Sequence, residues 1–408
     1  MLALSPDYYP KFQCIGSSCE DSCCIGWRVH LDKATYHLYK QNQHPNLRER
    51  FKNAVKRSDL KGDNQHFAVI EMAELGRCPF LDPDNLCAIH RNLGSKALSN
   101  VCATFPRRAN LSGTQFEYSL SLACPEAARL ALLQKEPMRF VEIPIDTTLA
   151  CATPPAKPSP HEEQSALLLN DLRALIIGIL QLRELPIDHR LILLGLLLED
   201  FEASSVANEA LPPVLQRYVG LLGAPDLLRN ELDKVESSLA VKIHLVAHLI
   251  GDIPTPTHNI RFRTLLDEAA QGLKFEDSQN DKLYEAYERD YRPYFEAQPH
   301  ILENYLVHYV IHNLFPVVRT SVVVQYRELI CDYLAITTLL FGQAVFHNGM
   351  TDALAVKTIQ SYTRFAGHYT HFKETVARTL EQQQLSDLRR LFQLLAQPKP
   401  SNAPAGAA

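Results

Sequence analysis

The sequence predicts a mainly α protein in which a small N-terminal α+β domain, rich in cysteine, docks on an all-helical domain. Eight of the ten cysteines lie between Cys14 and Cys124, so this part of the chain differs in composition from the rest. The segment TPPAKPSP holds four prolines and reads as a stiff, extended connector. After it, apolar residues recur at steps of three and four, and strand patterns are nearly absent. We therefore expect a cysteine-rich domain at 1–152, a linker at 153–160, a helical domain at 161–396 and a disordered tail at 397–408.

The N-terminal domain is predicted to contain short helices and two strands. Asp32 precedes a segment with apolar residues at helical spacing and should open a helix, and 46–57 should form another. Apolar patterns at 67–70 and 115–120 predict strands. Pro125, followed by an acidic residue in the first turn, should start a further helix.

The second domain is predicted to consist of helices separated by proline-containing turns. Turn signals occur at Leu185-Pro186, at Leu211-Pro212-Pro213 and at 253–256. No internal repeat is evident. Apolar periodicity predicts helices at 161–183, 187–203, 226–250, 300–314, 318–346 and 351–382.

Composition narrows the possible classes of protein. Charged residues make up 21% of the chain and the net charge is −5, which argues against nucleic acid as a partner. The longest run of apolar residues and glycine, 191–198, is far shorter than the ~20 residues of a membrane-spanning helix. Residues 1–10 lack the basic and apolar regions of a secretory signal. We therefore expect a cytoplasmic protein that binds neither nucleic acid nor membrane.

The clustered cysteines predict a metal-binding domain. A cytoplasm keeps thiols reduced, so clustered cysteines there favour metal over disulfides, although free cysteines can also be small buried hydrophobic residues. Zinc sites usually contain C-x2-C pairs, which this sequence lacks, and the irregular spacing fits an iron–sulfur cluster at least as well. One cluster with auxiliary thiols and two four-thiol sites are equally compatible with the pattern. The pool from which at least four ligands should come is Cys14, Cys19, Cys23, Cys24, Cys78, Cys87, Cys102 and Cys124.

The sequence predicts specific roles for the Cys23–Cys24 pair and for Cys124. Cys23 and Cys24 are adjacent and should point in different directions, so that one binds metal and the other packs or serves a second site. Cys124 precedes the helix that starts at Pro125. The free amide groups at that helix start should stabilise its thiolate.

Three N-terminal segments resemble the signature of the flagellin lysine-N-methylases. They are CIGSSCEDSCCIGWRVHLDKATY at 14–36, CPFLDPDNLCAIHRNLG at 78–94 and LSNVCATFPR at 98–107. The cysteine pattern is also similar to a wider group of zinc- or iron-chelating cysteine-cluster proteins. The resemblance is dense over 8–130 and continues more weakly through ENYLVHYVIHNLFP at 303–316.

The resemblance implies methylation of the ε-amine of lysine residues on bacterial flagellin. It implies S-adenosylmethionine as methyl donor, flagellin as partner, and an iron–sulfur cluster of the 4Fe-4S type, with zinc as the alternative metal. The alternative function is a zinc- or iron–sulfur-binding redox or scaffold protein without methyl transfer.

The residues themselves carry no familiar motif for binding the methyl donor. No two glycines are separated by a single residue, so the glycine-rich loop of Rossmann-like methyltransferases is missing. Cys19-x3-Cys23 begins the C-x3-C-x2-C pattern of radical enzymes, but position 26 is glycine. A methylase with this sequence must therefore use another fold.

Four side chains are candidates for binding the donor or the lysine. A methyl sulfonium is a cation, so carboxylates or aromatic faces should line its site. Glu20 and Asp21 lie between cysteines, and Trp27 is the single tryptophan. Arg107, with its neighbour Arg108, could hold the donor's carboxylate. The alternatives are a solvated acidic loop, a core tryptophan and arginines in surface ion pairs.

Two patterns in the helical domain have a structural and a functional interpretation. Tyrosines recur at helical steps over 284–294, which fits core packing or an aromatic protein-binding groove, with a helix break near Tyr291 caused by Pro293. His308 and His312 are four residues apart, a spacing that metal ligands on a helix use. Without a third ligand nearby, core or surface histidines are the favoured interpretation.

Overall fold

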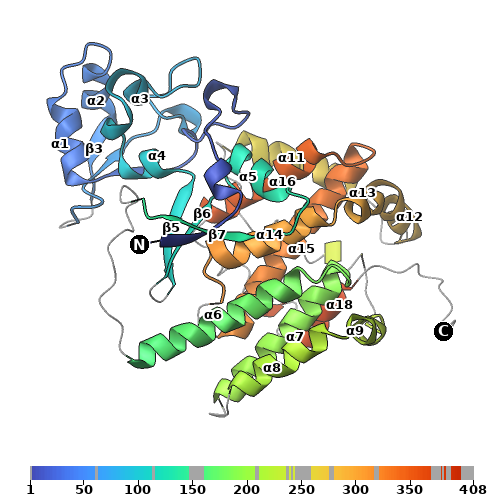
Figure 1. The fold of residues 1–408 in the computed structure, drawn as a ribbon. Helices are drawn as coiled ribbons and strands as arrows, with labels where there is room; N and C mark the ends of the chain where they lie inside the picture. The colour runs from blue at the N-terminus through green and yellow to red at the C-terminus, as the bar shows by residue number, and fades with distance from the viewer. Residues whose placement is uncertain are drawn as a thin grey trace.

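The computed structural model is mainly helical, with two small sheets built from N-terminal residues (Figure 1). The predicted tail at 397–408 and all of the predicted linker except Pro160 lie outside the described residues. The structure describes residues 2–59, 63–112, 115–146, 160–206, 211–235, 239, 242–243, 259–274, 280–316, 321–368, 378, 381–382 and 387–396.

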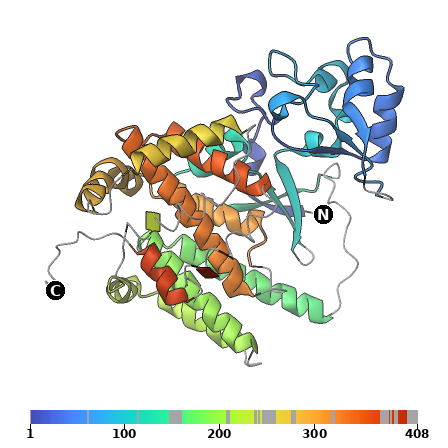
Figure 2. The ribbon, with the colours of Figure 1, turned by 180° about the vertical axis from the view of Figure 1, so that it is seen from behind.

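The larger sheet has four strands in the order β5-β6-β1-β7. Strands β1 and β6 are parallel, with Ala3 opposite Phe116, whereas the other two pairs are antiparallel. A parallel pair requires a long crossover connection. Here that connection contains the whole cysteine segment, which we define as residues 14–104 and which projects from one end of the molecule (Figure 2). The strands are β1 (Leu2–Pro6), β5 (Arg107–Ser112), β6 (Gln115–Leu120) and β7 (Phe140–Pro144).

The cysteine segment has a sheet and a hydrophobic core of its own. Its three antiparallel strands follow the order β2-β4-β3. Tyr39, Phe51 and Phe80 fill its centre, with the rings of Tyr39 and Phe51 stacked 4.4 Å apart. Asp32 caps the first helix by accepting a hydrogen bond from the Thr35 amide. Its strands and helices are β2 (Val29–Leu31), β3 (Val55–Arg57), β4 (Ala68–Ile70), α1 (Lys33–Gln41), α2 (Arg48–Ala54), α3 (Ala88–Leu93) and α4 (Asn100–Thr104).

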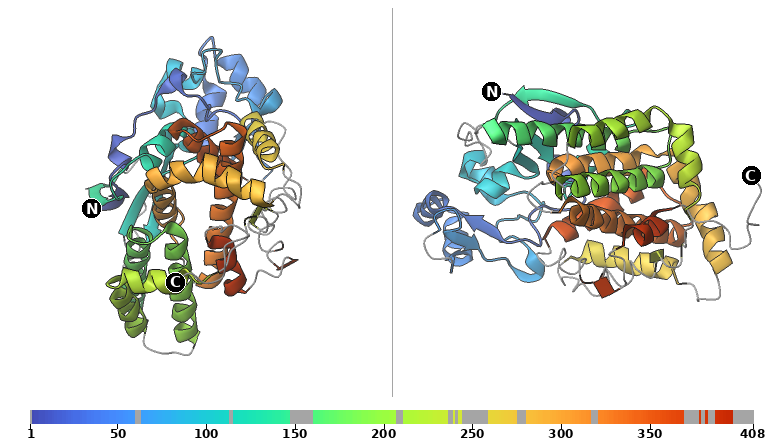
Figure 3. Two further views of the ribbon diagram at one scale, coloured as in Figure 1. Left: turned by 90° about the vertical axis from the view of Figure 1, so that its right-hand side faces the viewer. Right: turned by 90° about the horizontal axis from the view of Figure 1, so that it is seen from below.

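The rest of the chain is helical, and α15 runs through its middle (Figures 1 and 3). It packs against α7, α11 and α16. Among the described residues, α15 is long and apolar enough to cross a membrane, but 83% of its most apolar stretch is buried inside the protein, as in a core helix. The helices are α5 (Pro125–Leu132), α6 (Pro160–Leu180), α7 (Ile187–Val206), α8 (Leu211–Leu222), α9 (Pro225–Leu232), α11 (Ile260–Gly272), α12 (Asn280–Ala286), α13 (Arg292–Ala297), α14 (His300–His312), α15 (Val322–Phe346), α16 (Asp352–His368) and α18 (Leu388–Leu395).

Short helical turns complete the fold. A π-helical turn at Tyr287–Tyr291 joins α12 to α13 just before Pro293, whose missing amide interrupts the regular hydrogen-bond ladder. The helix is therefore irregular near Tyr291, where a break was predicted, but the chain continues through it as a π-helical turn. The 3-10 turns are Tyr9–Lys11, Gly16–Ser18, Glu74–Gly76 and Ser95–Ala97.

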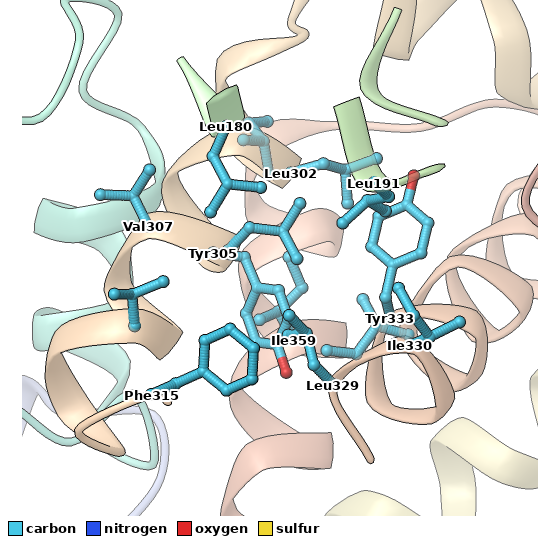
Figure 4. Packing of buried hydrophobic residues seen from close by; sticks show 14 of the residues in the cluster. Leu180, Leu191, Leu302, Tyr305, Val307, Phe315, Leu329, Ile330, Tyr333 and Ile359 are labelled. Carbon is cyan, nitrogen blue, oxygen red and sulfur yellow. The ribbon is translucent and has the colours of Figure 1, made fainter. Parts of the chain in front are cut away.

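The main hydrophobic core joins the larger sheet to the helices. Phe116 and Leu120 of β6 belong to the same buried cluster as residues of α7, α14 and α15. Figure 4 shows its centre, where Tyr305 of α14 lies among Leu329 and Ile359 from α15 and α16. Hydrophobic packing therefore couples the sheet directly to the helical part, while the core of the cysteine segment is separate.

The predicted mainly α class with an N-terminal α+β part is confirmed, but some element boundaries differ. The helix predicted at 46–57 ends at Ala54, and the chain continues as strand β3. The turn predicted at Leu211-Pro212-Pro213 is the start of α8, because proline is tolerated in the first turn of a helix. Of the helix predicted at 226–250, the structure describes α9 and few residues beyond it.

The crossing of α11 and α15 depends on two glycines. A Cβ on Gly272 would lie 2.1 Å from the Gly342 carbonyl oxygen, and one on Gly342 would lie 2.7 Å from the Ala269 carbonyl oxygen. We expect Gly342→Ala to lower the free energy of unfolding by about 1–3 kcal/mol, measured by urea denaturation. Gly220→Ala is the control, because its Cβ would meet nothing within 4 Å. Equal stability of both variants would contradict this tight crossing.

Candidate functional site

The eight cysteines of the predicted pool differ in exposure. Cys14 and Cys23 are exposed, Cys78 and Cys124 are buried, and the other four are partly buried. Cys331 lies outside the pool in the core of α15, and Cys151 lies outside the described residues.

Four thiols gather where three segments of the cysteine segment meet, and we call Cys24, Cys78, Cys87 and Cys102 the thiol group. The Cys78 amide donates to the Cys24 carbonyl at 2.9 Å, and Cys87 forms a β-bridge with Leu81. Burial, reinforced by the neighbouring thiol of Cys87, raises the pKa of Cys78 to about 11. Burial, with further contributions from Cys78 and Cys87, raises the pKa of Cys102 to about 12. Each of these thiols therefore lies near others of the group, and Cys23 lies near Cys78 and Cys102 as well.

Cys23 lies between the thiol group and two other cysteines. A hydrogen bond with Cys24 lowers the pKa of Cys23 to about 7, and the nearby Arg364 guanidinium acts in the same direction. The adjacent thiols of Cys23 and Cys24 therefore contact each other, and the expectation that they point apart is wrong for this irregular loop. Cys23 also interacts electrostatically with Cys124, as does Cys19.

Cys124 occupies the predicted N-cap position of α5, but its thiolate is not favoured. The amides of Glu126 and Ala127 do lower its pKa, as expected for a helix start. Burial acts more strongly in the opposite direction and raises the pKa of Cys124 to about 12. The expected stabilisation of the thiolate is thus present but outweighed by desolvation.

The thiol group can be compared with the ligand sets of a zinc ion and of a 4Fe-4S cluster. Among the residues that the structure describes, no three histidine, cysteine, aspartate or glutamate side chains lie close enough to share one metal ion. A single zinc ion needs four donors about 2.3 Å away from it. A 4Fe-4S cluster is also held by four thiolates, but each thiolate binds a different iron and the sulfur atoms stand further apart. The thiol group supplies four cysteine side chains from three segments, the number of ligands that either kind of centre requires.

The segment 19–27, which we call the cysteine loop, has no regular secondary structure, yet the backbone carbonyls of residues 21–25 accept hydrogen bonds. The Cys19 thiol donates to the Asp21 carbonyl at 3.3 Å, and the Trp27 indole donates to the Cys23 carbonyl at 2.5 Å. The Cys24 carbonyl accepts from the Cys78 amide. Arg364 of α16 donates to two further carbonyls, those of Ser22 and Ile25. Because buried carbonyls are rarely left without partners, these bonds fix the loop in one conformation.

Asp21, one of the predicted donor-binding residues, is held at the junction with the helices. Its carboxylate pairs with Arg364 and accepts a hydrogen bond from the Gln360 amide at 2.8 Å. The Asp21 and Arg364 side chains are only 14% and 13% exposed, which makes this a largely buried ion pair. Asp21 therefore contacts helix α16 and anchors the loop.

The other predicted candidates lie in different surroundings. Glu20 pairs with Arg129 of α5 at 2.7 Å and remains partly exposed. The Trp27 ring is partly buried and lies 5.8 Å from the Phe105 ring. Arg107 lies over the ring of Phe12 at 5.1 Å. Glu20, Asp21 and Trp27 thus share one loop, whereas Arg107 is on strand β5.

Sequence reasoning missed Gln360 and Arg364, although they connect the two parts of the molecule. They are one helical turn apart on α16, and Gln360 also donates to the Ala123 carbonyl at 2.9 Å, next to Cys124. An isolated glutamine and arginine in an amphipathic helix give no sequence signal. Only the fold brings them to the cysteine loop.

His308 of α14 is buried and His312 is half-buried, and both form hydrogen bonds. His308 Nδ1 is 2.7 Å from the Tyr8 hydroxyl, and His312 Nδ1 is 2.9 Å from the Ser119 hydroxyl. Their rings stack 5.0 Å apart, and Arg108 approaches His312 Nε2 at 3.4 Å. The predicted alternative of core histidines is confirmed. Of the tyrosines over 284–294, Tyr287, Tyr291 and Tyr294 pack against the main core, with Tyr287 and Tyr291 stacked 5.1 Å apart.

These histidines predict a loss of stability in acid. Burial and the Arg108 charge lower the pKa of His308 to about 3, and burial lowers the pKa of His312 well below its usual value. Below about pH 6.5 the unfolded chain binds protons that the folded protein does not, so stability falls as the pH drops from 6.5 toward 3. Each histidine can contribute at most about 1.4 kcal/mol per pH unit. Urea unfolding at several pH values should show a shallower slope for His308→Gln than for the wild type, and identical slopes would contradict this account.

The fold and the site define a mainly helical protein with a thiol-bearing N-terminal segment anchored on it. Residues 173–394 match a family model described as the FliB lysine N-methylase C-terminal domain. This match covers more than half of the chain, and the chain therefore belongs to the FliB lysine N-methylase family. The family resemblance seen in the cysteine motifs is confirmed.

Individual relatives give the same family. The chain is 38% identical over 138 residues to the lysine-N-methylase of Salmonella typhimurium strain LT2, a match that covers 34% of each chain. It is 38% identical over 138 residues to the flagellar biosynthetic protein FliU of Salmonella muenchen, covering 34% of this chain and 80% of the relative. The match thus spans about a third of the length of the curated lysine-N-methylase. No solved structure matches the chain.

Proposed function

We propose that this protein transfers methyl groups from S-adenosylmethionine to the ε-amines of lysine residues on bacterial flagellin, in the cytoplasm before the flagellin is exported. Membership of the FliB lysine N-methylase family carries the proposal. Two relatives support its parts: the lysine-N-methylase supports the reaction, and the flagellar biosynthetic protein FliU supports a flagellar substrate.

We further propose that the thiol group, Cys24, Cys78, Cys87 and Cys102, holds an iron–sulfur cluster. The gathering of these side chains from separate segments supports this, and a sequence without C-x2-C pairs fits an iron–sulfur cluster at least as well as zinc. When bound, such a cluster supplies a one-electron redox centre. For the protein itself, the four thiolates would tie three segments of the cysteine segment together.

The methyl donor should bind beside the cysteine loop. Its sulfonium is a cation, and the paired rings of Trp27 and Phe105 offer an aromatic face there. Glu20 adds a partly exposed carboxylate on the same loop. The Asp21 carboxylate already accepts hydrogen bonds from Arg364 and Gln360. In this site it would therefore orient the loop rather than contact S-adenosylmethionine.

Lysine methylation also requires an unprotonated amine, because an ammonium group has no lone pair. Desolvation lowers a lysine pKa, and so does a neighbouring cation. A substrate lysine that is desolvated next to the cationic sulfonium of the methyl donor would meet both conditions.

An assay on the anaerobically purified full chain tests this function. The protein is incubated with S-adenosylmethionine and flagellin, and flagellin peptides are weighed by mass spectrometry. Mass gains in steps of one methyl group on lysine would support the proposal. Unchanged lysines with a metal-loaded protein would overturn it in favour of a redox or scaffold role. Iron with sulfide, rather than zinc, in the purified chain would support the proposed cluster.

A further inference from the structure

Helix α16 holds the cysteine loop from the side of the helical domain. The Arg364 guanidinium donates to the Ser22 carbonyl at 3.1 Å and also to the Ile25 carbonyl, and it pairs with the Asp21 carboxylate. These three acceptors flank the adjacent Cys23 and Cys24 on both sides. One side chain of α16 thus fixes the backbone that presents both thiols.

Gln360, one turn earlier on α16, adds a second attachment. Its side-chain amide donates to Asp21 at 2.8 Å and to the Ala123 carbonyl at 2.9 Å. It therefore joins the cysteine loop to the residue that precedes Cys124. We call Arg364 and Gln360 together the clamp.

Helix α11 holds the clamp in place through contacts with α16. Arg261 donates to the Gln360 side-chain oxygen at 3.2 Å and to the Ser361 hydroxyl at 3.3 Å. The rings of Phe262 and Phe365 stack 4.4 Å apart in the same helix pair. The position of the cysteine loop therefore depends on the packing of two helices that belong to the other part of the molecule.

The chemistry of the clamp requires arginine. A guanidinium presents a planar fork of five donors and can serve a carboxylate and two carbonyls together, whereas an ammonium is a compact point charge. The Asp21–Arg364 pair is largely shielded from water, and breaking it would leave one charge buried without its partner.

We propose that Arg364 and Gln360 are positioning residues through which the helical domain sets the conformation of the cysteine loop and, with it, how firmly the thiol group retains its metal. The part concerning metal rests on the proposed function. The part concerning the loop stands on the contacts of the described residues alone.

Hydrogen exchange on the metal-free full chain tests the positioning. In Arg364→Lys and Arg364→Gln, amides of the cysteine loop should exchange about tenfold faster or more, because two hydrogen bonds from a charged donor are lost. Gln360→Ala should give a smaller increase. Arg263→Gln, on an exposed position of α11, is the control and should leave the loop unchanged. Rescue of loop protection by lysine at 364 would overturn the role of the guanidinium fork, and unchanged exchange in all variants would overturn the clamp.

Metal release tests the second part. The metal-loaded wild type, Arg364→Lys, Gln360→Ala and Arg263→Gln are mixed with excess chelator, and the visible absorption of the metal centre is followed with time. We expect about tenfold faster loss from Arg364→Lys than from the wild type and Arg263→Gln, with equal circular dichroism of all four proteins. Equal rates would overturn the link to metal retention. A wild-type chain that binds no metal would overturn the proposed cluster together with this link, and hydrogen exchange would still decide the positioning of the loop.

Discussion

Replacing Glu303 by alanine is expected to lower the free energy of unfolding by about 3–5 kcal/mol, the range for removing one partner of a buried ion pair. The Glu303 side chain is 1% exposed and accepts from Arg190, 4% exposed, at 2.9 Å and from Arg183 at 2.7 Å. Arg190 also donates to the Leu180 and Leu185 carbonyls, so this network ties α14 to the α6–α7 connection. Without the carboxylate, the Arg190 charge would remain buried beside carbonyls alone.

A matched variant at the surface shows how much of this loss of stability depends on burial of the ion pair. Glu296 pairs with Arg292 at 2.7 Å, but its side chain is 62% exposed. Glu296→Ala should cost only about 0.3–0.5 kcal/mol, as is usual for exposed pairs one helical turn apart. Both variants are compared by urea denaturation with circular dichroism. Similar losses of stability in the two would contradict the importance of the buried network.

Substituting Cys102 by serine is expected to remove most of the bound metal and to loosen the core of the cysteine segment. Even residues that merely support a ligand change metal affinity by about 10- to 100-fold, so loss of a ligand thiolate should weaken binding by more than about 100-fold. Cys102 packs at the edge of the small core around Phe51 and Phe80, so metal binding and folding of that core should be coupled. Metal analysis and hydrogen exchange over 29–97 measure the two effects.

Cys331→Ala is the control for this substitution. Cys331 is buried in α15, in the core of the helical part, and is separate from the thiol group. Its replacement should leave the metal content unchanged, even if a small cavity lowers overall stability. Equal metal loss from the Cys102 and Cys331 variants would show that metal retention follows general stability rather than ligation.

Local signals in the sequence were sufficient to predict many of the helices and strands. Asp32 caps α1 and Pro125 starts α5 as predicted, because capping and proline geometry act within a few residues. Long helices such as α7 and α15 follow apolar periodicity that packing against neighbours preserves. By contrast, β1 and β2 were not predicted, because they form through partners distant in the chain.

The residue types of the site could be predicted from the sequence, but the contacts between these residues could not. Clustering of cysteines predicted a shared location, and the thiol group agrees with that. The contact between Cys23 and Cys24, and the dominance of burial over the helix start at Cys124, depend on how an irregular loop is buried. The Asp21–Arg364 pair joins residues more than 300 positions apart, and no local pattern indicates it.

The most direct test of the account compares methyl transfer by three forms of the full chain under anaerobic conditions. Wild type, Arg263→Gln and Cys102→Ser are each given S-adenosylmethionine and flagellin, and methyl groups on flagellin lysines are quantified by peptide mass spectrometry. The account predicts methylated lysines with the wild type and Arg263→Gln and almost none with Cys102→Ser. Absence of methylation by a metal-loaded wild type would contradict the proposed function, and full activity of a metal-free Cys102→Ser variant would contradict the dependence of methyl transfer on the thiol group.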